Sequence, residues 1–200
     1  MTREHILCKA LRCIDEVYPE ATDAVEQHFP LEDFADEACR RVLLSAPLQA
    51  LPPGADFSNA PLTDRGDGSG VIVLPGDFLR LRRLRMQGWQ RPVTEPIGEE
   101  APQYNLQFNP FSRGGIAKPV AVLAAGHTLL EYYSLPPGTE HVIAEARYIP
   151  DTAGSDMPEP LADAAAWMLA ALVLQVSGET EAGQQAQARA GELLNLSSHV

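Results

Sequence analysis

Five arginines lie close together in the middle of the chain, and arginine is the side chain best suited to contact phosphate. They are Arg80, Arg82, Arg83, Arg85 and Arg91. Their spacing also fits a structural role, because leucines alternate with the first two arginines. After the Arg82–Arg83 pair the alternation resumes in the opposite phase at Leu84 and Met86. This pattern predicts a half-buried strand with a bulge, whose arginines face solvent or a protein partner, with nucleic-acid contact as the alternative.

Aromatic side chains extend this cluster. Trp89 follows Gly88, and Tyr132 and Tyr133 are adjacent in a later apolar stretch. Flat rings can stack on a base or a sugar, although packing in a core or an interface is their more frequent use. We take Trp89 and the five arginines as the candidate partner-contact residues.

The stretch DRGDGSG, residues 64–70, places two carboxylates in a glycine-rich loop of the kind that binds hard cations. The further acidic ligands and the closing glutamate of a calcium loop are missing. Asp64 and Asp67 therefore do not predict a metal site, and no cofactor is expected. Arg65, Gly66 and Asp67 also spell an adhesion tripeptide, a match that three letters produce by chance.

The histidines are scattered over several predicted elements and one end of the chain. They are His5, His28, His127, His141 and His199. The spacings of a metalloprotease helix, a nucleophile elbow, a phosphate-binding loop and a dinucleotide fold are all missing. The sequence therefore predicts a protein that is not an enzyme. His127 and His141 flank one predicted hairpin near Glu140, which leaves an enzyme of unrecognised type as an alternative.

Charge is distributed unevenly along the 200 residues. Residues 1–64 carry a net charge of −7, residues 65–150 carry +1 and residues 151–200 carry −6, which gives −12 in total. Acidic ends repel the phosphate backbone of DNA, so sequence-specific nucleic-acid binding is not expected. The three cysteines form no paired motif and predict reduced thiols. The sequence predicts neither a signal peptide nor a membrane span.

Apolar residues recur at helical spacing in two segments at each end of the chain. The first segment, residues 4–18, has Leu7, Leu11, Ile14 and Tyr18 in its apolar stripe, which Ile6, Ala10, Cys13 and Val17 widen, and the second segment covers residues 30–47. Residues 161–176 are apolar around nearly the whole circumference, which is typical of a helix buried among neighbours or between subunits. Gly178 suits the end of that helix. The last segment carries alanines on one side, which predicts a closely packed hairpin with the helix before it.

Short segments of strand character lie between these helices, separated by Gly and Pro turns. They cover residues 70–74, 78–86, 104–108, 119–124, 128–134 and 141–149. Residues 48–69 are rich in Pro, Gly, Asp and Ser and predict an exposed connection. The chain is thus expected to form a single α+β domain over residues 1–200, with an N-terminal helix pair, a central antiparallel β-meander and a C-terminal helical hairpin. In this prediction residues 1–47 and 159–197 form the helical part and residues 70–149 the β part.

Several of these segments carry a family resemblance. VLPGDFLRL at residues 73–81, followed by WQRPV at residues 89–93, resembles the head-to-tail connector, or adaptor, proteins of tailed bacteriophages. KPV at 118–120, LEYY at 130–133 and the alanine-rich helix that opens with PEPL at 158–161 fit the same pattern. The resemblance covers residues 70–197, and Gly76 departs from the acidic or small polar residue that the family favours.

The resemblance implies a structural phage or prophage protein that carries no catalytic residues. It would form an oligomeric ring with copies of itself and join the portal protein to a tail protein, so that DNA passes in transient proximity without being recognised. Its location would be the virion or the cytoplasm of a bacterial host. The residues themselves leave open a non-viral module that binds a ligand or a protein through the β-meander.

Overall fold

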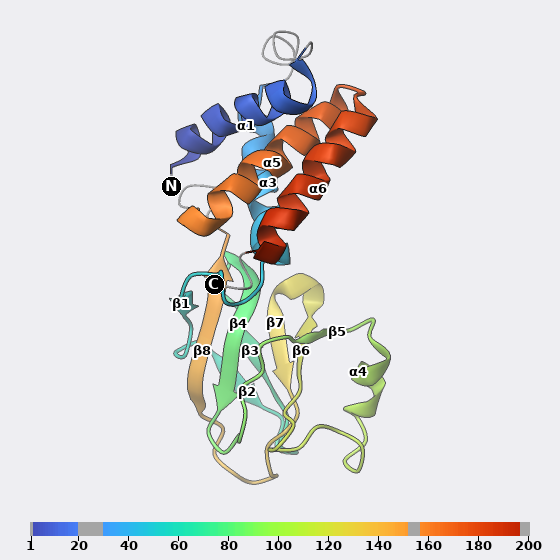
Figure 1. The fold of residues 1–200 in the computed structure, drawn as a ribbon. Coiled ribbons are helices and arrows are strands. Elements are labelled where there is room, and N and C mark those ends of the chain that lie inside the picture. The colour runs from blue at the N-terminus through green and yellow to red at the C-terminus, as the bar shows by residue number, and fades with distance from the viewer. Residues whose placement is uncertain (1, 20–29, 152–156, 197–200) are drawn as a thin grey trace. The chain divides into compact units, whose positions relative to one another are not determined.

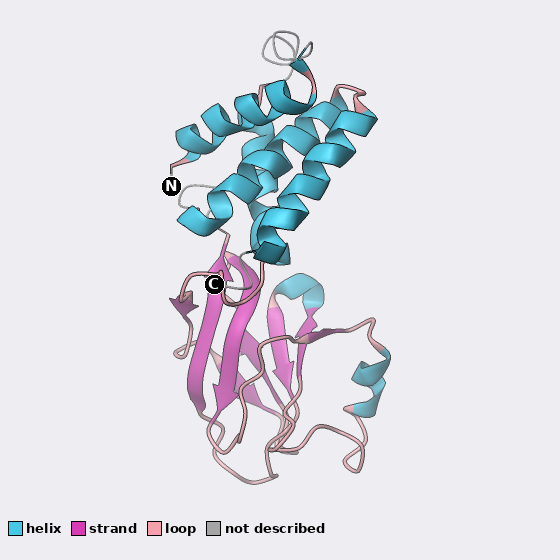
Figure 2. Cartoon of the chain, viewed as in Figure 1, coloured by secondary structure: helices cyan, strands magenta, loops and turns pink. Residues whose placement is uncertain are grey.

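Two compact units make up the chain. The computed structural model describes residues 2–19, 30–151 and 157–196 (Figure 1). Residues 1–52 and 151–200 form a helical unit, and residues 53–150 form a β unit. The α+β class is confirmed: Figure 2 distinguishes the helices from the strands, and the chain order places helices towards both ends and strands between them. Residues 1, 20–29 and 197, which the sequence analysis placed in the helical part, lie outside the described residues.

Helix α5 (Glu159–Val176) is the central element of the helical unit. Helices α1 (Arg3–Val17), α3 (Glu32–Ser45) and α6 (Thr180–Leu196) all pack against it (Figure 1). Leu161, Leu169 and Val173 are fully buried. Most of the apolar circumference predicted from the sequence is therefore covered by the chain's own helices, although Trp167 is only half-buried and Val176 is exposed.

The α5–α6 hairpin forms as its small residues predict. Gly178 has a φ of +94°, and the amide of Glu179 donates to the carbonyl of Leu174 at 2.9 Å, which is a Schellman end to α5. Ala186 and Ala190 of α6 are fully buried. A Cβ atom at Gly183 would lie 3.2 Å from the carbonyl oxygen of Ala171, so the two helix backbones approach closely.

The β unit consists of two sheets. One has the order β1 (Ala55–Asp56), β8 (Ile143–Pro150), β4 (Phe78–Met86). The other has the order β2 (Leu62–Asp64), β3 (Gly70–Val73), β7 (Leu129–Tyr132), β6 (Ala121–Ala124), β5 (Ile97–Gly98). Neighbouring strands are antiparallel except β5 and β6.

The two sheets share one core, which explains why the strands do not follow the predicted meander. Leu84 and Met86 of β4 and Leu130 and Tyr132 of β7 belong to the same buried cluster. The break at Pro75–Gly76 lets the chain leave one sheet after β3 and enter the other at β4, so β3 pairs with β7 and β4 pairs with β8. The apolar faces of both sheets are buried against each other in this way.

Two segments of the β unit differ from their predictions. Residues 104–108 were predicted as a strand, but helix α4 (Pro102–Leu106) begins there, with a proline in its first turn, where proline suits a helix. Residues 48–69 were predicted as an exposed connection, yet they include β1 and β2 and bury Phe57. The ring of Phe57 packs edge-on against Tyr148 at a centroid distance of 5.6 Å. β1 and β2 have only two and three residues, so they are too short to show the alternation of apolar and polar residues by which a strand is recognised in a sequence.

The close α5–α6 contact predicts a sharp difference between two alanines of the same helix. Ala186→Leu is expected to lower the free energy of unfolding by about 1–3 kcal/mol, because the larger side chain has no room in the buried contact. Ala188→Leu, on the exposed side of α6, should change it by less than about 0.5 kcal/mol. Denaturant titration of both variants measures the difference, and equal effects would contradict the packing described.

Candidate interaction surfaces

Strand β4 carries four of the five candidate arginines on the side away from the core. Leu81 pairs with Tyr148 and Arg83 with Arg147, so Arg82 is skipped in the register. The predicted bulge at Arg82–Arg83 is confirmed. It keeps the leucines before and after it buried while two successive arginines point away from the core.

These arginines have different surroundings. The Nε of Arg83 lies 2.9 Å from a carboxylate oxygen of Glu145, across the strand pair. Burial lowers the pKa of Arg80, with Glu95 acting in the opposite direction. Arg85 and Arg91 are exposed, and their side chains form no ion pair with any residue that the structure describes. Because Arg83 also faces Arg147, this side of β4 and β8 is a basic surface.

Trp89 is not at that surface, which corrects its assignment as a partner-contact residue. Only 3% of it is exposed, and it lies in the shared core of the two sheets. Gly88, with a φ of +92°, makes the turn that follows β4, and the next residue returns to the core. Tyr132 and Tyr133 are buried as well. The three rings are packing residues and offer no platform for a base or a sugar.

The two histidines of the predicted hairpin do not meet. His127 is exposed in the turn η2 (Ala125–His127), before β7. The side chain of His141 is only 2% exposed, and its Nδ1 lies 2.8 Å from the hydroxyl of Tyr132, at the far end of β7, and 3.2 Å from Asp64. Since β7 separates them, they cannot act together on one substrate. His28 and His199 lie outside the described residues.

The loop between β2 and β3 uses its charged side chains internally. Asp67 accepts hydrogen bonds from the amide and the hydroxyl of Ser69, at 3.0 and 2.6 Å, and contacts Arg113. These contacts lower the pKa of Asp67. Arg65 forms an ion pair with Glu131. The adhesion tripeptide is therefore part of a folded loop, and within the described residues no three potential ligands gather to hold a metal ion.

Glu131 is a buried carboxylate that sequence reasoning missed. It lies on β7, 7% exposed, on the face of the five-stranded sheet opposite the shared core. Arg65 and the hydroxyl of Tyr133 contact it closely, and the hydroxyl of Tyr104 donates to it at 3.3 Å. Burial and the bond to Glu131 raise the pKa of Tyr133, so this hydroxyl remains a donor. The only sequence signal was an acid inside an apolar strand.

The donor Tyr104 belongs to a segment, residues 101–118, that we call the projecting segment. Figure 1 shows its helix α4 at the edge of the β unit, beyond β5. The ring of Phe108 packs against those of Tyr104 and Tyr133, at centroid distances of 5.0 and 6.2 Å. Much of the apolar surface of this segment nevertheless faces solvent. Leu106, Phe108, Phe111 and Ile116 are all exposed, Phe111 completely.

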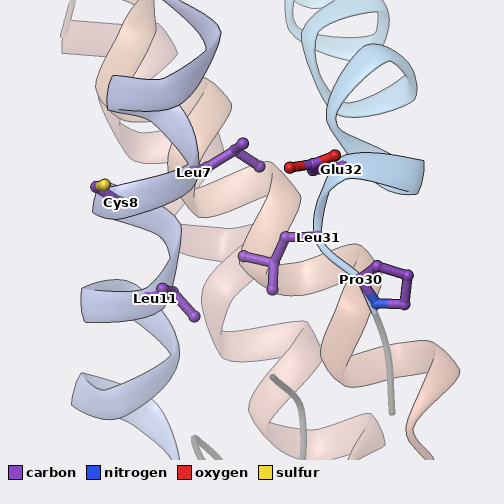
Figure 3. Close-up of a pocket in the computed structure, with 6 residues that line it drawn as sticks. All are labelled: Leu7, Cys8, Leu11, Pro30, Leu31 and Glu32. Atoms are coloured by element: carbon purple, nitrogen blue, oxygen red, sulfur yellow. The ribbon is translucent and has the colours of Figure 1, made fainter. Parts of the chain in front are cut away.

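The helical unit has an apolar pocket of about 410 Å³ between α1 and the start of α3. Figure 3 shows Leu7 and Leu11 of α1 directed towards Leu31, with Glu32 above them. Within the predicted apolar stripe of the first helix, Ile6, Ala10 and Ile14 are fully buried, whereas Leu7 and Leu11 are only half-buried. The buried face of α1 is thus centred to one side of Leu7 and Leu11, and these two leucines line the pocket.

No protein-family model and no curated protein matches the sequence. Among the helices of the described residues, none is both long and apolar enough to cross a membrane.

The Glu131 contacts predict an unequal effect of two conservative substitutions. Glu131→Gln is expected to lower the free energy of unfolding by about 1–3 kcal/mol, because the buried donors lose a charged acceptor. Glu145→Gln, which breaks the partly exposed pair with Arg83, should cost less than about 1 kcal/mol. Urea titration measures the stabilities, and limited proteolysis should show earlier cleavage in residues 101–118 for Glu131→Gln. Equal stability of the two variants would show that Glu131 is not an anchor.

The three cysteines are expected to differ in reactivity. Burial raises the pKa of both Cys13 and Cys39 to about 11, and nearby acids add to the effect. Only Cys8 is exposed. At pH 8 a thiol reagent should therefore modify Cys8 at least tenfold faster than the other two. Peptide mass spectrometry after timed alkylation identifies the modified residue, and similar rates for all three in the native protein would contradict this burial.

Proposed function

We propose that this protein is a structural assembly protein of the head-to-tail connector type, which forms an oligomeric ring between a portal protein and a tail protein of a phage or prophage. It would act in the virion or in the cytoplasm of the bacterial host. The sequence segments that resemble the connector family support the proposal. The structural observation that carries it is the projecting segment, which presents exposed aromatic side chains from an anchored position.

Several large apolar side chains gathered on one short segment are unusual for a protein that acts alone, and such patches mark interaction sites. Phe108 and Phe111 are 61% and 100% exposed, although the segment that bears them is anchored at Glu131 and Tyr133. An anchored segment loses little conformational freedom when it binds. This combination suits a permanent contact in an assembly.

The distribution of charge also suits contacts between copies. The helical unit, residues 1–52 and 151–200, contains 6 basic and 17 acidic residues, whereas the β unit contains 9 and 10. Their net charges are thus −11 and −1, and the β unit carries the basic surface of β4. Opposite surfaces on one chain allow each copy to attract the next. An acidic helical unit also repels DNA, so transient proximity would not lead to binding.

Each of the two alternative functions, a ligand-binding module and an enzyme, depends on residues that lie in unsuitable positions. A module that binds a ligand through Trp89, Tyr132 and Tyr133 would need these rings at the surface, but they are buried. An enzyme centred on His127 and His141 would need the two side chains together, but β7 separates them.

Mass measurement of the full-length protein with and without its portal protein tests the proposal. We expect a complex that contains several copies of the chain per portal ring. The variant Phe111→Ser should fail to assemble while keeping its fold, because this side chain is fully exposed. Val73→Ser, at another exposed apolar residue of the β unit, is the matched control and should assemble normally. A chain that stays monomeric with portal at any concentration would overturn the proposed function.

A further inference from the structure

We propose that neighbouring copies are joined by Phe111 of one copy, which inserts into the apolar pocket between α1 and α3 of the next. This inference rests on the proposed ring function and specifies the contact that would build it. It assigns roles to two features that a single copy leaves unpartnered among its described residues: a fully exposed ring on the β unit and an open apolar pocket on the helical unit.

The tip that carries Phe111 is organised by its own hydrogen bonds. The amide of Phe111 donates to the Oδ1 of Asn109 at 3.0 Å, and the amide of Arg113 donates to the Asn109 carbonyl at 2.9 Å. Gln107, which is buried, accepts from the amide of Gly114 at 3.1 Å. The ring is therefore held out to solvent by a fixed turn, which reduces the entropy lost on insertion.

The pocket has the composition and size to receive such a ring. Leu7, Leu11, Pro30 and Leu31 line this open cleft, and its volume of about 410 Å³ leaves room for an aromatic side chain. Figure 3 shows the side chains of Leu7, Leu11 and Leu31 converging from two helices. Insertion of Phe111 would remove the exposed parts of Leu7, Leu11 and Pro30 from water together with the ring itself.

Charge indicates that the occupant is a second copy of this chain. Residues 106–118 contain no acidic side chain and two basic ones: Arg113, which is paired with Asp67 of its own copy, and Lys118, which is exposed and supplies the available positive charge. The pocket is bordered by Glu32 and belongs to a unit with a net charge of −11. The projecting segment of another copy therefore brings both the apolar ring and the opposite charge, whereas an acidic partner or DNA would be repelled.

The symmetry of this contact fits a ring. Because the ring of Phe111 and the pocket are different surfaces, each copy can give one and receive one. Such heterologous contacts continue from copy to copy until the rotation between them closes a ring. A contact between identical patches would stop at a dimer.

The exposed thiol beside the pocket provides the test. In Pro110→Cys the new thiol lies next to Phe111, and Cys8 lines the pocket. Air oxidation with copper–phenanthroline of the full-length protein, assembled on its portal, should give a disulfide between these positions of two copies, identified by peptide mass spectrometry. The link should be lost in Pro110→Cys, Cys8→Ser. Asn59→Cys, at an exposed residue elsewhere on the β unit, should give at least tenfold less cross-link.

Two further variants test the side chains themselves. Phe111→Ser in the Pro110→Cys background should reduce the cross-link about tenfold or more, as loss of a buried aromatic ring predicts, and Glu32→Lys should reduce it in low salt. An assembly on the portal in which Pro110→Cys links no better than Asn59→Cys, or links to the portal or tail protein instead, would overturn this contact and leave the proposed function standing. Failure to assemble on the portal at all would overturn both.

Discussion

A carboxylate buried on the outer face of the five-stranded sheet constrains much of the β unit. Removing the charge of Glu131 from water costs several kcal/mol unless donors replace the water. These donors come from three places in the sequence: Arg65 in the β2–β3 loop, Tyr104 in the projecting segment and Tyr133 beyond β7. The contacts with this one carboxylate therefore hold the β2–β3 loop and the projecting segment against the sheet. They also fix the position of the exposed aromatic side chains of residues 101–118.

The two units differ in what they leave for other molecules. In the helical unit, α5 is the most apolar helix, yet α1, α3 and α6 cover it, so most of its apolar surface is already used in folding. The β unit buries a core between its sheets but still exposes Phe108 and Phe111 and the arginines of β4. Apolar side chains that remain exposed after folding indicate where a partner binds, whereas the total hydrophobicity of an element does not.

Sequence reasoning was correct where a local pattern is compatible with only one backbone conformation. The doubled arginine in an alternating strand required a bulge, and Gly178 with the alanines of α6 required a close hairpin. It failed where tertiary contacts decide. Nothing near Trp89 shows whether its ring turns inward, residues 104–108 have alternation too short to separate strand from helix, and β1 exists only because Ala55 pairs with Tyr148 far along the chain. The partners of Glu131 are likewise set by topology, which the sequence does not reveal.

The β unit is inserted in the sequence between the two halves of the helical unit. During translation, α1 and α3 are therefore made first, while the α5 residues that will cover Ile6, Ala38 and Val42 are still missing. At typical synthesis speeds the nascent chain waits on the order of ten seconds for them. Through that interval its early helices expose apolar faces that a chaperone can hold, and the helical unit closes only when residues 159–196 have left the ribosome.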